Sequence, residues 1–138
     1  MSSKPIQITQ FDLDRLKKLV EEAAYTDYRG RDYLARLQAE LEGAQVVPPQ
    51  EVSQAVITMN STAVLLDLET REEETYTLVF PEDAEVARGR ISILAPIGTA
   101  MLGYEVDDTF EWPVPDGKRR LQVRRILYQP EAAGDYHL

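Results

Sequence analysis

Residues 64–80, with the sequence VLLDLETREEETYTLVF, have the pattern of two β-strands joined by a polar turn. Apolar side chains recur at every second position on both sides of residues 69–72: Val64, Leu66 and Leu68 before them, and Tyr76, Leu78 and Phe80 after them. A period of two is typical of strands with one buried face, because successive side chains point to opposite sides of a sheet. This stretch therefore predicts an antiparallel β-hairpin.

The same period continues toward the C-terminus. Apolar or aromatic residues lie two apart in three further places: Ile91 and Ile93, Phe110 and Trp112, and Leu121 and Val123. Residues 115–117, Pro-Asp-Gly, predict a tight turn between the last two strands, and the slip in alternation at residues 124–125 predicts a β-bulge. Residues 96–102 predict a short helix that begins with a proline and stops at Gly103. From Pro130 onward we expect an extended tail.

The N-terminal third has a helical period instead. Thr9 and Asp12 resemble a helix start with an acid in the first turn. Apolar residues then recur at spacings of three and four in two runs: Leu13, Leu16, Val20 and Ala23, followed by Leu34, Leu37, Leu41 and Ala44. Two such seams predict a short antiparallel helical hairpin of the coiled-coil type, which ends before the prolines at 48–49. We expect an α+β protein with a hairpin over residues 1–47, a β-rich domain with one short helix over residues 48–138, and a separate core in each.

Composition narrows the possible functions. The 138-residue chain has a formal net charge of −9, and 43% of its residues are hydrophobic, which is globular composition. Duplex nucleic acid is bound through clustered Lys and Arg, so we expect no strong direct nucleic-acid binding. The chain has no cysteine, which excludes disulfides and thiol chemistry. No apolar run approaches about 18 residues, so we expect a cytoplasmic protein that does not bind membranes.

We find no pattern that predicts catalysis. Gly98 and Gly103 have the spacing of a phosphate-binding loop, but the Lys and Ser or Thr that must follow are absent. The single histidine, His137, is the penultimate residue, where nothing would hold its tautomer. The acidic runs at 72–74 and 82–85 are typical of solvated strand ends, and their spacing does not force convergence on a metal. We therefore expect no catalytic residue, no metal site and no cofactor.

The turn between the two predicted helices carries a different combination of residues. Asp27 lies there beside Tyr25 and Tyr28. An acid near the start of the second helix is favoured by the helix dipole alone. Aromatic residues at an exposed tip are also common at protein interfaces. Both interpretations remain open, and Tyr25, Asp27 and Tyr28 are candidate contacts to a partner.

Several motifs together resemble a known family. They are LEGAQVVPP (41–49), MNS (59–61), ISILAPIG (91–98), MLG (101–103) and QPEAAGDY (129–136). In combination they resemble the carboxyl half of the transcript-cleavage factors GreA and GreB, and the short hairpin and the C-terminal motif are most similar to the Rnk subfamily. The resemblance implies an FKBP-like β-rich domain and a coiled coil. It also implies binding to RNA polymerase at the rim of the secondary channel.

In that family the region matching residues 92–103 faces the polymerase rim. We call residues 92–103 the docking segment, and its candidate contacts are Ser92, Ala95, Pro96, Ile97, Gly98 and Thr99. Pro96 and Gly98 shape the backbone and leave a low surface. Ile97 is expected to pin the segment onto the sheet.

The sequence departs from the cleavage factors at the hairpin. Those factors carry two tip acids three residues apart that help to hold magnesium, whereas here Gly30 lies three residues after Asp27. Residues 31–43 give a second helix of roughly 20 Å, and the cleavage factors have one longer by roughly 20 Å or more. We therefore expect a non-catalytic regulator that competes with GreA/GreB-type factors without stimulating cleavage.

Two alternatives remain. The FKBP-like fold prompts a prolyl isomerase or chaperone, although fold is weak grounds for function. The Rnk name stands for regulator of nucleoside diphosphate kinase, which prompts direct regulation of that kinase. A transcription regulator could produce the same effect through an indirect link.

Overall fold

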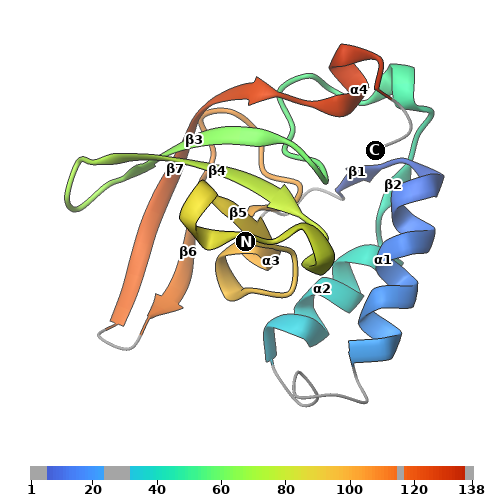
Figure 1. The fold of residues 1–138 in the computed structure, drawn as a ribbon, viewed down its shortest axis with the longest axis horizontal. Helices are drawn as coiled ribbons and strands as arrows, with labels where there is room; N and C mark the ends of the chain where they lie inside the picture. Colours follow the sequence, from blue (N-terminus) through green and yellow to red (C-terminus); the bar gives the residue numbers. More distant parts are fainter. Residues whose placement is uncertain (1–5, 24–31, 115–116, 136–138) are drawn as a thin grey trace.

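The computed structural model describes residues 6–23, 32–114 and 117–135. A helical hairpin, formed by α1 (Gln10–Ala23) and α2 (Asp32–Glu42), lies beside a five-stranded sheet (Figure 1). This confirms the predicted combination of N-terminal helices and a C-terminal sheet. Two short strands, β1 (Gln7–Ile8) and β2 (Gln45–Val46), pair in parallel at the base of the hairpin. The sequence did not predict them, because two residues are too few to show a period.

The sheet contains β3 (Thr62–Asp67), β4 (Glu73–Val79), β5 (Arg90–Ser92), β6 (Thr109–Val114) and β7 (Gly117–Tyr128). Their order is β5-β4-β3-β7-β6, with β4 and β5 parallel and the other neighbours antiparallel. The β3–β4 hairpin is therefore confirmed. β6 and β7 pair up to Val114 opposite Gly117, while Pro115 and Asp116 of the predicted turn lie outside the described residues.

The β-bulge is also confirmed. Val64 lies opposite Arg125, whereas the next residue, Leu65, lies opposite Val123, which leaves Arg124 as the extra residue on β7. The alternation in β3 predicts that Val64, Leu66 and Leu68 point to the buried face of the sheet, and the structure differs from this in part. Val64 is buried as predicted, but it is Ala63 and Leu65 that belong to the core cluster, and Leu66 is only half-buried. Because 64, 65 and 66 are all apolar, a shift of one residue exchanges the two faces without changing the pattern.

Short helices flank the sheet. α3 (Pro96–Met101) begins with its proline as predicted, and Gly103 follows it in the left-handed region with φ of 88°. Single 3-10 turns occur at η1 (Pro49–Glu51), η2 (Pro81–Asp83) and η3 (Val86–Arg88). The expected extended tail is wrong, because residues 130–133 form the helix α4 (Pro130–Ala133). A proline at its first position and a left-handed Gly134 after it supply the start and stop that the expectation overlooked. No helix in the described part of the chain is long and apolar enough to cross a membrane.

The expectation of two separate cores is also wrong. One continuous cluster of buried side chains includes Leu16 and Leu37 of the hairpin together with Ile57, Leu65 and Met101 of the β-rich part. α3 makes the connection, since it packs against β6 and β5 on one side and against α2 on the other (Figure 1). A narrow apolar seam looks the same in a free coiled coil and in a hairpin that also packs sideways, so the sequence could not distinguish them.

The shared core predicts how a hairpin mutation propagates. Leu37 is fully buried, so Leu37→Ala should cost about 2–5 kcal/mol of unfolding free energy. Because its neighbours include residues of both parts, hairpin and sheet should still unfold in one transition, with a lowered midpoint for both. Amide hydrogen exchange read at α1 and at β3 measures this, and Gln38→Ala on the exposed side of α2 is the control. Melting of the hairpin alone, with β3 protection unchanged, would contradict it.

Candidate functional site

The start of α1 is built around a buried acid. Thr9 caps the helix, as predicted: its hydroxyl accepts a hydrogen bond from the Asp12 amide at 3.2 Å, and its carbonyl accepts one from the Leu13 amide at 2.9 Å. The Asp12 side chain is only 2% exposed, and its Oδ1 has no hydrogen-bond partner among the described residues. Burial, with the nearby Glu131 as a second cause, raises the pKa of Asp12 from 3.8 to about 7. Asp12 is therefore held largely protonated in mildly acidic solution.

Two of the sequence motifs meet beside this acid. The Thr58 hydroxyl donates to Glu131 Oε1 at 2.8 Å, across 73 positions of sequence. Ser61 Oγ lies 2.9 Å from Thr58 Oγ1 and also accepts the Thr58 amide at 2.9 Å. Since the Thr58 proton is directed at Glu131, the Ser61 hydroxyl is the donor between the two. Ser61 of one motif and Glu131 of the other are thus joined through Thr58. We call the buried residues Asp12, Thr58, Ser61 and Glu131 the polar junction.

Further hydrogen bonds hold α4 over this junction. Gln129 Nε2 donates to the carbonyls of Ser53 and Val56, both at 2.7 Å. The Tyr128 hydroxyl donates to Asp135 Oδ2 at 2.5 Å, and this bond raises the pKa of Tyr128 to about 12. The C-terminal residues are therefore part of the folded structure up to at least Asp135.

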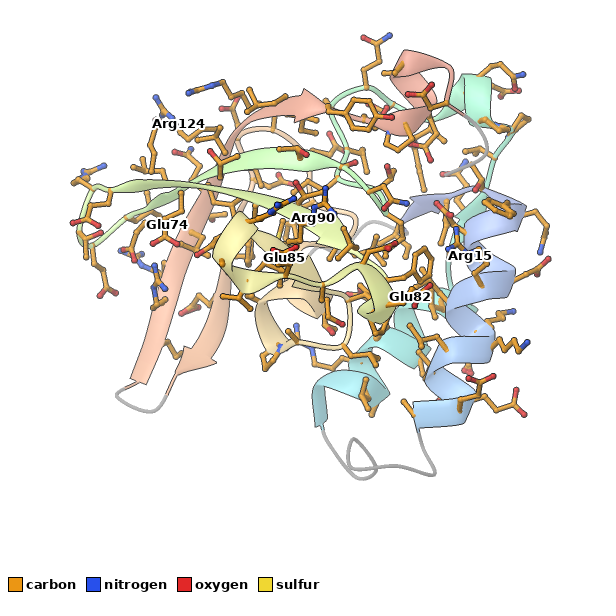
Figure 2. All side chains as sticks on the ribbon, viewed as in Figure 1. Arg15, Glu74, Glu82, Glu85, Arg90 and Arg124 are labelled. Atoms are coloured by element: carbon orange, nitrogen blue, oxygen red, sulfur yellow. The ribbon has the colours of Figure 1, made fainter. Side chains whose placement is uncertain are left out.

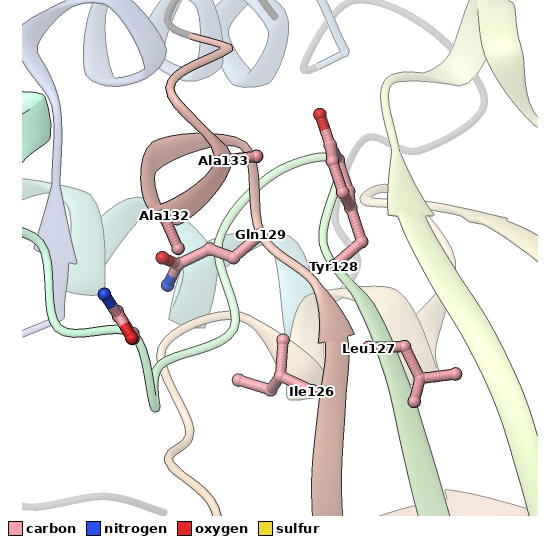
Figure 3. A pocket seen from close by; sticks show the side chains of 7 residues that line it. Ile126, Leu127, Tyr128, Gln129, Ala132 and Ala133 are labelled. Carbon is pink, nitrogen blue, oxygen red and sulfur yellow. The ribbon is translucent and has the colours of Figure 1, made fainter.

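An open pocket of about 300 Å³ lies beside α4 (Figure 3). It is lined by Gln54, Ile126, Leu127, Tyr128, Gln129, Ala132 and Ala133. None of these side chains is a carboxylate, an amine or an imidazole, and the Tyr128 hydroxyl is already bonded to Asp135. The pocket therefore has no group for acid–base or metal chemistry.

The docking segment divides into a buried part and a reachable part. Ile97, Gly98 and Thr99 are buried, whereas Ser92, Ala95 and Pro96 are half-buried. The Thr99 hydroxyl donates to the Ile93 carbonyl at 2.6 Å. A Cβ atom added to Gly98 would overlap the Ser92 carbonyl oxygen, so only glycine allows this close approach.

This division shows that three of the six candidate residues have packing roles. Ile97 pins the segment onto the core, as expected, and Gly98 and Thr99 also hold it from inside. A partner can reach Ser92, Ala95 and Pro96 directly. The tip residues Tyr25, Asp27 and Tyr28 lie outside the described residues.

The acidic residues near the strand ends are used in ion pairs. Asp67 Oδ2 lies 2.7 Å from Arg119 Nη2, and Glu74 lies 3.3 Å from the same nitrogen. Asp67 Oδ1 accepts the amides of Glu69 and Thr70, and these bonds together with Arg119 lower the pKa of Asp67. Within the described ranges, no three acidic or histidine side chains gather as a metal site requires.

One contact between the hairpin and the sheet had no signal in the sequence. The Arg15 guanidinium lies 3.8 Å from the ring centre of Phe80 and 5.0 Å from that of Phe11. The helical period placed Arg15 among the outer, solvated positions, and the strand pattern marked Phe80 only as apolar. Their meeting depends on how α1 lies against the end of β4. Asp12 and Glu131 were missed for the same reason.

A five-stranded sheet joined to a short N-terminal helical hairpin is similar to the structures of a class of transcription factors. Residues 52–128 match the family model for the C-terminal part of the transcription elongation factors GreA/GreB, and residues 4–47 match that for the Rnk N-terminus. The chain is 39% identical over 139 residues to the regulator of nucleoside diphosphate kinase of Escherichia coli K12, with both proteins covered completely. The chain therefore belongs to the GreA/GreB family and, within it, to the Rnk branch.

Two further comparisons agree. A solved transcription elongation factor GreA/GreB from Nitrosomonas europaea superposes with a TM-score of 0.77 at 38% identity, covering 91% of this chain and 100% of that one. GreA of Chelativorans sp. is 36% identical over 95 residues, which are 69% of this chain and 60% of GreA. The similarity to GreA thus covers only part of GreA.

The buried acid predicts a pH dependence of stability. The pKa of Asp12 is about 7 in the folded state against 3.8 for a free side chain, so between pH 4 and 7 the folded state binds more protons than the unfolded state. The contribution of Asp12 to the free energy of unfolding therefore falls as pH rises through this window. Asp12→Asn should remove that slope and gain stability relative to wild type above pH 7.

Urea unfolding between pH 4 and pH 8 measures the difference between variant and wild type. Asp14→Asn, on the exposed side of the same helix, is the control and should leave the slope unchanged. A variant–wild-type difference at Asp12 that is constant with pH contradicts the assignment of a raised pKa to this carboxyl.

Proposed function

We propose that this protein is a non-catalytic transcription regulator that binds RNA polymerase at the rim of the secondary channel and competes there with GreA/GreB-type factors. Its family membership supports a role in transcription. The match to the GreA/GreB C-terminal part includes the whole docking segment, residues 92–103. A polymerase partner also implies a cytoplasmic location. The FKBP-like nature of the β-rich domain belongs to the same proposal.

The observation that carries the proposal is the geometry of the docking segment. Pro96 opens α3 with no side-chain cap, and Ala95 precedes it in an extended conformation. Ile97, Met101 and Leu102 are buried directly behind these residues, so the backbone cannot recede when a partner approaches. Small side chains on a rigid support let a second protein come close at little entropic cost.

The length of the hairpin supports binding without cleavage. α1 has 14 residues and α2 has 11, which at about 1.5 Å per residue gives helices of about 21 Å and about 16 Å. In the cleavage factors that this sequence resembles, the second helix is about four turns longer, and this length lets the tip reach the active centre of the polymerase. Magnesium ligands lie about 2 Å from the ion. A hairpin that ends several turns before the active centre cannot place a carboxylate within that distance of the ion.

The docking segment predicts the effect of a charge at Pro96. Pro96→Asp should weaken polymerase binding at least about tenfold, because it places a charge where the surfaces meet. The melting temperature should change little, because Pro96 is half-buried and Asp is acceptable in the first turn of a helix. Competition with a labelled GreA/GreB-type factor for polymerase measures the affinity.

Pro49→Asp is the matched control. Pro49 opens η1, is half-buried like Pro96, and lies in an element that packs against α4 rather than α3. It should leave competition unchanged. If Pro96→Asp and wild type bind polymerase with equal affinity, the docking surface lies elsewhere. If Pro96→Asp does not fold, Pro96 has a structural role.

The short hairpin predicts the outcome of a cleavage assay. Arrested elongation complexes incubated with this protein should release no cleaved transcript above the intrinsic level. When a GreA/GreB-type factor is present, increasing amounts of this protein should reduce its cleavage, since both occupy one site. Stimulation by this protein alone, at a level comparable to a cleavage factor, would overturn the proposal.

A prolyl isomerase is less well supported. Such an enzyme needs an open pocket lined with aromatic side chains, but Phe80, Phe110 and Tyr104 are buried in the core, and the last two stack at 4.9 Å. Direct regulation of nucleoside diphosphate kinase is prompted by the name of the Escherichia coli relative. A pull-down with this protein as bait, scored for polymerase and for the kinase, distinguishes the two partners.

A further inference from the structure

Arg15 is the charged side chain through which α1 touches the end of β4. It projects from α1 toward the sheet (Figure 2), and its guanidinium carbon lies 3.8 Å from the centre of the Phe80 ring. Phe80 follows directly after β4 and precedes η2. The ring is only 3% exposed and belongs to the shared core cluster.

This contact depends on direction, unlike the apolar contacts around it. A guanidinium is attracted to the face of an aromatic ring, where the quadrupole is negative, and its planar shape allows it to stack there. Leucine and isoleucine side chains in the shared core exclude water without favouring one orientation. The Arg15 side chain is also half-buried, which strengthens the attraction to the ring.

A second contact holds the hairpin at its base. A Cβ atom added to Gly103 would overlap the Ile6 side chain, so the chain before α1 lies directly on the end of α3. β1 and β2 then pair next to it, with the Gln45 amide donating to the Ile6 carbonyl at 2.8 Å. Arg15 lies farther along α1, in its second turn. The hairpin therefore contacts the β-rich part both at its base and farther along α1, at Arg15.

We propose that Arg15 is a positioning residue: by stacking on Phe80 it sets the direction of the helical hairpin relative to the β-rich domain. The relevance of that direction to polymerase rests on the proposed function, in which the domain binds the rim while the hairpin points into the channel. Other groups around Arg15 are consistent with this role. The guanidinium lies within 5.0 Å of the centres of both the Phe11 and the Phe80 rings, and Asp12, one turn earlier, lies close enough for the Arg15 charge to act on its pKa.

The experiment measures the direction of the hairpin in the free protein. The sequence has no cysteine, so cysteines introduced at Glu22 of α1 and Glu111 of β6, both exposed, accept one spin label each. Double electron–electron resonance then gives the distribution of distances between hairpin and sheet. Arg15→Gln should shift or broaden this distribution. Lys18→Gln, which removes the same charge from the exposed side of α1, should not.

Two more variants isolate the stacking. Phe80→Leu keeps an apolar side chain but removes the ring, and it should broaden the distribution as Arg15→Gln does. Arg15→Lys keeps a cation that the ring still attracts, so it should restore much of the wild-type width. If Arg15 only added stability, its substitution would lower the melting temperature and leave the distance distribution of the folded protein unchanged. The proposal would be overturned if Arg15→Gln and Phe80→Leu both fold and both keep the wild-type distance distribution.

Competition for polymerase adds a separate readout. If the hairpin direction matters for insertion, Arg15→Gln should compete about tenfold less well than wild type, while Lys18→Gln should match wild type. Failure of the wild-type protein to compete at all would refute the proposed function. The distance distributions would still decide the role of Arg15, because they need no polymerase.

Discussion

The structure depends on one hydrophobic core that the hairpin and the sheet share. Leu16 and Leu37 of the hairpin and Met101 of α3 are all fully buried members of this cluster. An isolated pair of helices of 14 and 11 residues is marginal in water, since helices of this length gain most of their stability from packing. The hairpin is therefore stable because it lies against α3 and the sheet. The same packing removes the freedom that an independent coiled coil would have.

Polar contacts then determine where the elements can lie within this core. Thr58 hydrogen-bonds to both Ser61 and Glu131 in a buried site, and Asp12 of α1 is close enough to Glu131 to be affected by its charge. Buried polar groups tolerate few arrangements, because a buried donor or acceptor that loses its hydrogen bond destabilises the folded state. Arg15 on Phe80 adds a directional contact one turn farther along α1. Ser61 and Glu131, which belong to two of the family motifs, thus contribute to the shape of the protein.

Buried and accessible residues alternate within the short segment that we propose as the docking surface. Ile97, Gly98 and Thr99 face inward and hold the backbone, while Ser92, Ala95 and Pro96 remain accessible. A surface made in this way is rigid before a partner arrives, which lowers the ordering cost of binding. The relatives named as transcription elongation factors match this part of the chain. The shortened hairpin, in contrast, is where the chain matches the Rnk model.

The sequence by itself determined the elements whose signal is local. The strands of the β3–β4 hairpin, the bulge at Arg124, the cap at Thr9 and the helix at Pro96 follow from periods, turn residues and backbone preferences within a few positions. Only the tertiary structure decided that the two parts share one core, that residues 130–133 return as a helix onto the junction, and which face of β3 is buried. It also decided that Asp12 lies beside Glu131 and that Arg15 lies over Phe80. The physical reason is that these outcomes depend on contacts between residues far apart in the chain. The local sequence around an apolar or charged side chain does not specify which distant surface that side chain will contact.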